Sequence, residues 1–206
     1  MKTFFLGLAS IAFILSACAA EINVQRGRMA LLYGDPNAAI ASFQSAAKLD
    51  PNYFYFSVFP QGIWTYVGRA CYIAGKYPEA RQALERAISL HKDDNMAKLY
   101  LGLSLARSGD RQRGLKEIED GLRGLHEWLD YVNQYAAFSY GQYWDPLGEI
   151  RAEIQNSLTM ISGKDIDWQK LIASGEWVGR KLEEEIDIAR RQESRDRSRG
   201  DGSSSD

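Results

Sequence analysis

The chain has 206 residues, and its 25 Lys and Arg against 27 Asp and Glu give a formal net charge of −2. This charge creates no overall basic field and argues against nucleic acid as the main partner. Two Cys and two His exclude a disulfide framework and argue against a four-ligand zinc site, so no cofactor is expected. The apolar share of 45% indicates a folded chain.

The first predicted segment is a signal peptide over residues 1–17. Lys2 precedes an apolar run of about a dozen residues, which fits a secretory signal and is shorter than the roughly 20 residues of a membrane-spanning helix. The run ends in Leu15-Ser16-Ala17-Cys18. This motif resembles a bacterial lipobox, which implies that the Cys18 thiol carries a lipid after cleavage and anchors the protein to a membrane.

The residue after the cysteine bears on the location. Ala19, rather than Asp, follows Cys18, and in lipoproteins this implies the periplasmic face of the outer membrane. The alternative is an ordinary signal peptide that is cut after Ala17 or Ala20, with no lipid attached.

A sequence repeat follows, between about residues 21 and 124. Three segments begin at the glycines Gly34, Gly75 and Gly109, at intervals of 41 and 34 residues. A glycine stands seven residues before each of these, and an apolar residue stands nine residues after it. These positions are Gly27, Gly68 and Gly102, and Phe43, Leu84 and Ile118. With apolar residues at intervals of three and four, the repeat predicts three helix pairs, over residues 21–52, 61–94 and 95–124.

The residue types in the repeat are those of a known family. The second copy carries Trp64, Val67-Gly68, Tyr77, Ala80, Leu84 and Ala87. This order resembles the tetratricopeptide repeat (TPR). The resemblance implies an all-α fold in which about three helix pairs of residues 18–124 form a right-handed α-solenoid.

The resemblance also implies a concave groove, lined by the first helix of each pair. The expected partner-binding residues there are Arg28, Arg69, Tyr72 and Arg107. Because guanidinium groups suit carboxylates, the groove is expected to hold a protein or peptide with acidic groups or a free C-terminus. The alternative is that these arginines pair with neighbouring Asp or Glu.

An aromatic insert separates the first two repeats. Residues 53–59 hold five aromatic side chains. One interpretation is that the insert covers the core. The other is a contact patch for a partner or for a second copy of the chain, which predicts a homo-oligomer.

The C-terminal third is predicted to be a helical cap over residues 125–193, followed by a disordered tail over residues 194–206. Helical periodicity continues past residue 125, a helix is expected to start at Asp145-Pro146 and end at Ser162-Gly163, and another is expected to start at Asp165 or Asp167. Four of the five Trp lie here, as expected for side chains that cover the open end of a solenoid. The alternative is an aromatic surface that binds cell-wall polymer, as part of an enzyme or an enzyme regulator.

No catalytic constellation is found. His126-Glu127 lacks the second His of a zinc protease helix, because Asp130 stands there. No strand is expected, and therefore no phosphate loop that follows one. Cys71 is expected to pack in the core as a small hydrophobe. We therefore expect a non-catalytic scaffold in envelope assembly or secretion, anchored through Cys18.

Overall fold

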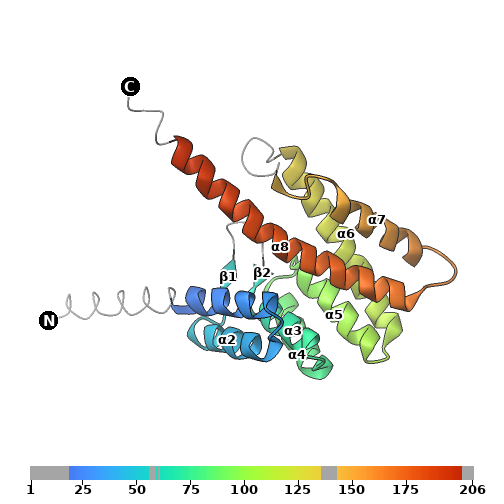
Figure 1. The fold of residues 1–206 in the computed structure, drawn as a ribbon. Coiled ribbons are helices and arrows are strands. Elements are labelled where there is room, and N and C mark those ends of the chain that lie inside the picture. The colour runs from blue at the N-terminus through green and yellow to red at the C-terminus, as the bar shows by residue number, and fades with distance from the viewer. Residues whose placement is uncertain (1–18, 56–58, 60, 136–142, 201–206) are drawn as a thin grey trace. The chain divides into compact units, whose positions relative to one another are not determined.

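A computed structural model describes residues 19–55, 59, 61–135 and 143–200 of the chain (Figure 1). It is helical apart from one short hairpin, so the all-α prediction is confirmed at this level. The chain forms two compact units. The first consists of Met1–Phe56 and Pro60–Ala97, and the second of Ser57–Phe59 and Lys98–Asp206.

The first unit holds two helix hairpins. Residues 19–32 are helical and are followed by α2 (Pro36–Leu49). The second hairpin is α3 (Ile63–Ile73) and α4 (Tyr77–Leu90), and α3 packs against both α2 and α4. The rings of Phe43 and Tyr66 stack between the hairpins at 5.2 Å. The Lys76 Nζ donates to Asn37 Oδ1 over 3.0 Å and joins the two turns.

The predicted turn glycines all adopt the left-handed backbone. Gly34, Gly75 and Gly109 have φ values of 76°, 73° and 94°. A residue with a Cβ rarely adopts this conformation, which reverses the chain after a helix. Pro36 and Pro78 then stand in the first turns of α2 and α4, where a missing N–H is tolerated. The repeated glycines therefore end one helix of each pair so that the next can return.

The other three glycines of the repeat allow close helix contact. A methyl group added at Gly27 would lie 2.4 Å from Phe43 Cε1, and one at Gly68 would lie 2.4 Å from Leu84 Cγ. At Gly102 it would lie 2.5 Å from the backbone nitrogen of Ile118. Each of the three sequence pairs is thus a close contact between the two helices of one hairpin. At Gly27 and Gly68 the neighbouring atoms belong to a side chain, and at Gly102 the nearest ones belong to the backbone.

The prediction that the chain has no strand is wrong near the aromatic insert. The absence of strands was expected, but β1 (Phe54–Tyr55) and β2 (Gln61–Gly62) pair antiparallel, with Phe54 opposite Gly62. Two-residue strands leave no alternating pattern long enough to read from a sequence. The hairpin is stabilised at its base, where Ile63 N donates to Tyr53 O over 3.0 Å.

The second unit contains α5 (Asn95–Arg107, from Lys98 on), α6 (Arg111–Tyr135), α7 (Glu149–Ile161) and α8 (Trp168–Gly200). Helix α6 runs without a break past residue 124, so the predicted division between repeats and cap does not separate compact units. Helix α8 continues to Gly200, seven residues into the predicted tail.

The two predicted helices after residue 144 are present, with one shifted start. Helix α7 ends at Ile161, as expected, but begins at Glu149. The Asp145 carboxylate accepts from the backbone N–H groups of Ile150 and Arg151 at 2.9 and 3.1 Å, so Asp145 caps the helix from a distance. Asp167 accepts from Lys170 N at 3.0 Å and caps α8, as one of the two candidates.

In the part of the chain that the structure describes, every helix is too short or too polar to cross a lipid bilayer.

Candidate functional site

The predicted lipidation site lies outside the described residues. Cys18 directly precedes the helical residues 19–32, and the attachment of a lipid there stays a prediction.

Cys71 is a free, buried cysteine, as expected for core packing. Burial raises the pKa of the Cys71 thiol, and the charge of Glu79 acts in the same direction. A buried thiol with a raised pKa is a poor nucleophile, so Cys71 is not a candidate reactive site.

The predicted groove residues of the first unit are buried. Arg28 is 3% exposed and Arg69 is 2% exposed, and Tyr72 is also buried. The Arg28 guanidinium donates to Gln25 Oε1 at 3.1 Å, and Arg69 donates to Gln61 Oε1 at 3.0 Å. These bonds satisfy part of the polar requirement that burial imposes on an arginine. Partner contact with these residues stays a prediction, and it requires that a side chain now buried becomes accessible.

Arg107 differs from the other predicted groove residues. It belongs to the second unit, stands at the end of α5, and has a side chain that is 42% exposed. Its guanidinium donates to Glu176 Oε1 of α8 over 2.9 Å. Of the predicted partner-binding residues, Arg107 is therefore the one that a partner can reach directly.

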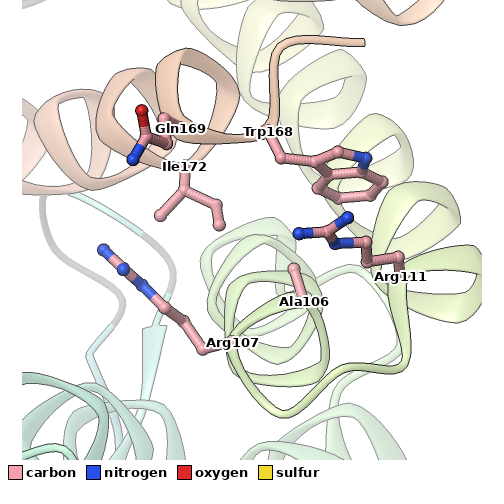
Figure 2. A pocket seen from close by; sticks show the side chains of 6 residues that line it. All are labelled: Ala106, Arg107, Arg111, Trp168, Gln169 and Ile172. Carbon is pink, nitrogen blue, oxygen red and sulfur yellow. The ribbon is translucent and has the colours of Figure 1, made fainter.

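Arg107 also lines a pocket within the second unit. The pocket has a cavity volume of about 430 Å³ and is lined by Ala106, Arg107, Arg111, Trp168, Gln169 and Ile172. As Figure 2 shows, Ala106 and Arg107 come from the end of α5, Arg111 comes from the start of α6, and the last three come from the first turns of α8. The Arg111 guanidinium lies 5.3 Å from the centre of the Trp168 ring, within cation–π range.

The position of α8 creates this pocket. A methyl group added at Gly179 would lie 2.5 Å from the Tyr100 hydroxyl oxygen, and one at Gly175 would lie 3.1 Å from Leu103 Cδ2. The two glycines therefore bring α8 close to α5, and the first turns of α8 then lie over the end of α5. Sequence reasoning missed Arg111, because the three pocket residues of α8 that face it are more than fifty positions away in the sequence.

The aromatic insert and the Trp-rich segment meet in one cluster of the second unit. The Phe59 and Trp128 rings lie 4.7 Å apart edge to face, and Trp128 and Trp144 have the same spacing and geometry. Phe59 and Trp144 are buried, at 2% and 3% exposure. For these residues the packing interpretation is favoured over an exposed aromatic patch. A polymer-binding surface would have to use a tryptophan outside this cluster, such as Trp168.

One buried carboxylate of the first unit, that of Asp94, is a polar group that sequence reasoning missed. Asp94 is 1% exposed. Its Oδ2 accepts from the Thr65 hydroxyl at 2.5 Å and from Gly62 N at 3.2 Å, and its Oδ1 accepts from Ala97 N at 2.9 Å. Burial raises the pKa of the Asp94 carboxyl, and these hydrogen bonds oppose the rise. Asp94 thus ties the start of α5 to β2 and α3, which is a structural role.

The described residues contain no group of three His, Cys, Asp or Glu side chains that fits a metal ion. The His126 Nδ1 lies 3.0 Å from Asp130 Oδ2, one turn along α6, so Asp130 contacts His126 where a zinc helix would hold a second His. His91 packs against the Phe54 ring at 4.1 Å. Both histidines are thus engaged in local packing or pairing.

Comparison with models of known protein families and with characterised proteins finds no match to this chain.

Proposed function

We propose that this chain is a non-catalytic interaction scaffold of the tetratricopeptide type, held at the bacterial envelope by a lipid on Cys18. The observation that carries the proposal is a packing unit that occurs three times. Each copy has a turn glycine with positive φ and a second glycine, seven residues earlier, that contacts the apolar residue of the returning helix. A spacing of glycines and apolar residues that recurs along the chain, and that accompanies a helix hairpin each time, is typical of a repeat protein.

The arrangement of the first two hairpins supports a stacked array. Helix α3 packs against both neighbours, and the turn of the second hairpin bonds to the turn of the first. Continued through the third hairpin, this arrangement is the α-solenoid that we propose. Such arrays present extended faces to protein and peptide partners, which is why a binding role follows from the architecture.

A cap for the last hairpin is part of the proposal. A repeat array exposes the apolar face of its final repeat unless another element covers it. In the second unit, Gly175 and Gly179 of α8 lie against Leu103 and Tyr100 of α5. Further along α8, Val178, Leu182 and Ile186 are buried. These contacts support a covering role for α8 on the third hairpin.

The lipid anchor is tested by metabolic labelling with a clickable palmitate analogue, which reports acylation of the mature chain. We expect label on the wild-type chain and on Cys71→Ser, and none on Cys18→Ser. Cys71→Ser is a matched control, since the sequence has two cysteines and the substitution is the same. Because several acyl chains anchor a protein stably, membrane fractionation should place the wild type and the control with the outer membrane.

Two results would contradict the anchor. Label that persists on Cys18→Ser would place the lipid elsewhere. An unlabelled wild type that is released in soluble form would establish the ordinary signal peptide, cut after Ala17 or Ala20. Neither result decides whether the chain binds a partner.

A further inference from the structure

We propose that the pocket of Ala106, Arg107, Arg111, Trp168, Gln169 and Ile172 binds an apolar monocarboxylate. The ligand is a carboxylic acid with an adjoining aliphatic or aromatic group. It is either a small free acid or the C-terminal residue of a polypeptide. The proposal goes beyond the scaffold function, because it requires neither the lipid nor the solenoid.

The charges around the pocket select a monoanion. The Arg107 charge is balanced by Glu176, whose carboxylate lies 2.9 Å away. Within the described residues, the Arg111 side chain makes no hydrogen bond or ion pair, and its guanidinium lies over the Trp168 ring. Its neighbour Asp110 is paired with Arg113 at 3.6 Å. The pocket therefore offers one uncompensated positive charge, and the Glu176 carboxylate disfavours a dianion such as phosphate.

The geometry of Arg111 suits a carboxylate in particular. The contact of Arg111 with the Trp168 ring is a cation–π contact, and such a contact needs none of the N–H donors of the guanidinium. Those donors match the two oxygens of a carboxylate. In Figure 2 the Arg111 guanidinium points into the space between Trp168 and Ile172, where such a group would bind. Gln169 adds an amide that can donate to or accept from a second polar group of the ligand.

The remaining wall is apolar. Ala106 and Ile172 are 7% and 8% exposed, and the Trp168 ring adds an aromatic edge beside them. The volume of about 430 Å³ is within the range of roughly 300–1,000 Å³ that small-ligand sites occupy. A leucine- or phenylalanine-sized group fits this wall while the acid faces Arg111. Arg111 and Gln169 are exposed, so the pocket is open to a chain end as well as to a free acid.

The test is a titration of the full-length chain, with the indole N–H of Trp168 followed by NMR and assigned by its loss in Trp168→Phe. The small probes are N-acetyl-leucine and N-acetyl-leucinamide. The chain-end probes are the peptide acetyl-Gly-Ser-Gly-Leu with a free and with an amidated C-terminus. We expect each acid that binds to do so at least about tenfold more tightly than its amide, because a charge-assisted hydrogen bond is lost in the amide.

Matched variants connect binding to the pocket. Arg111→Ala is expected to weaken acid binding about tenfold or more, and Arg123→Ala to leave it within about twofold. Arg123 is a suitable control because it lies on the same helix and pairs with Glu119 at 2.7 Å, outside the pocket lining. Far-UV circular dichroism confirms that both variants remain folded, as expected for exposed side chains.

Tighter binding of the small acid identifies a metabolite site, and tighter binding of the peptide acid identifies a chain-end site; both support the proposal. It is overturned if neither acid shifts the Trp168 signal up to about 10 mM, a concentration that largely fills a site with a Kd on the order of 1 mM. It is also overturned if the amides bind as well as the acids, or if Arg111→Ala binds as the wild type does. None of these results bears on lipid labelling of Cys18.

Discussion

The contact between Gly68 and Leu84 yields the sharpest prediction about the repeat. Leu84 is fully buried, and a methyl group at position 68 would lie 2.4 Å from its Cγ. Overpacking of this kind costs about 1–3 kcal/mol, whereas the better helix propensity of alanine returns about 1 kcal/mol. Gly68→Ala is therefore expected to lower the free energy of unfolding by up to about 2 kcal/mol in the wild type.

The sign of this effect should reverse when the leucine is shortened. Leu84→Ala alone is expected to cost about 2–5 kcal/mol, because it leaves a cavity beside Gly68. In that background the new methyl group at position 68 enters the cavity, and the same Gly68→Ala should stabilise by about 1 kcal/mol through helix propensity. The expected coupling energy between the two substitutions is about 1–3 kcal/mol.

The third repeat provides a contrast. A methyl group at Gly102 would lie 2.5 Å from Ile118 N and 2.7 Å from Gly114 O, and both atoms belong to the backbone of α6. Shortening Ile118 does not move them, so Gly102→Ala should destabilise in the wild type and in Ile118→Ala alike. Gly34→Ala controls for the substitution itself, because it strains the backbone at φ 76° with no atom within 4 Å.

Urea denaturation measures all of these free energies, with helical circular dichroism and tryptophan fluorescence as independent probes. Two-state values are taken where the two probes give coincident transitions. Strictly additive effects of Gly68→Ala and Leu84→Ala would refute the proposed contact. A rescue of Gly102→Ala by Ile118→Ala would refute the backbone approach of α5 and α6.

Three further predictions concern buried groups. Because burial raises the folded-state pKa of Asp94 above its ordinary value of 3.8, its stabilising contribution is complete below that pH and is lost as the pH rises through the raised pKa. The unfolding free energy of the wild type, taken relative to that of Asp94→Asn, should therefore fall as the pH rises from about 4. Urea denaturation of both chains at several pH values measures this difference, and a difference that rises with pH would contradict the prediction. Arg69→Glu buries a carboxylate and is expected to lower the free energy of unfolding by on the order of 3 kcal/mol or more. Arg107→Glu, at an exposed position, should change it by less than about 1 kcal/mol. Equal urea midpoints for the two variants would count against the burial of Arg69. In a Cys18→Ser background, Cys71 should react with Ellman's reagent only after unfolding, so rapid labelling of the native chain would show an accessible thiol.

The helix hairpins could be predicted from the sequence because their determinants are local. A turn glycine such as Gly75 and a contact glycine such as Gly68 stand at fixed spacings, and the backbone geometry of a helix converts those spacings into positions. The end of α7 and the start of α8 could be predicted for the same reason, since Ser162 and Asp167 act within one turn of the helix that they end or begin.

The surroundings of the arginines could not be predicted in this way. The repeat places Arg28 and Arg69 on the first helices of their pairs, but their burial depends on what lies over those helices. The pocket residue Arg111 meets Trp168 across 57 positions of sequence. Likewise, Phe59 joins Trp128 and Trp144 through contacts between distant segments. Periodicity carries no information on such contacts, since it describes one element at a time.

Photo-crosslinking in intact cells shows whether the chain is a membrane-anchored scaffold that holds a partner. A photoreactive amino acid replaces Arg107, which is exposed on the repeat, or Arg123, an exposed arginine of α6 that serves as the control. We expect a discrete protein adduct at position 107, none at position 123, and loss of the adduct when Cys18→Ser releases the chain. Identical adduct patterns at both positions, or an adduct at 107 that is unaffected by Cys18→Ser, would contradict this expectation.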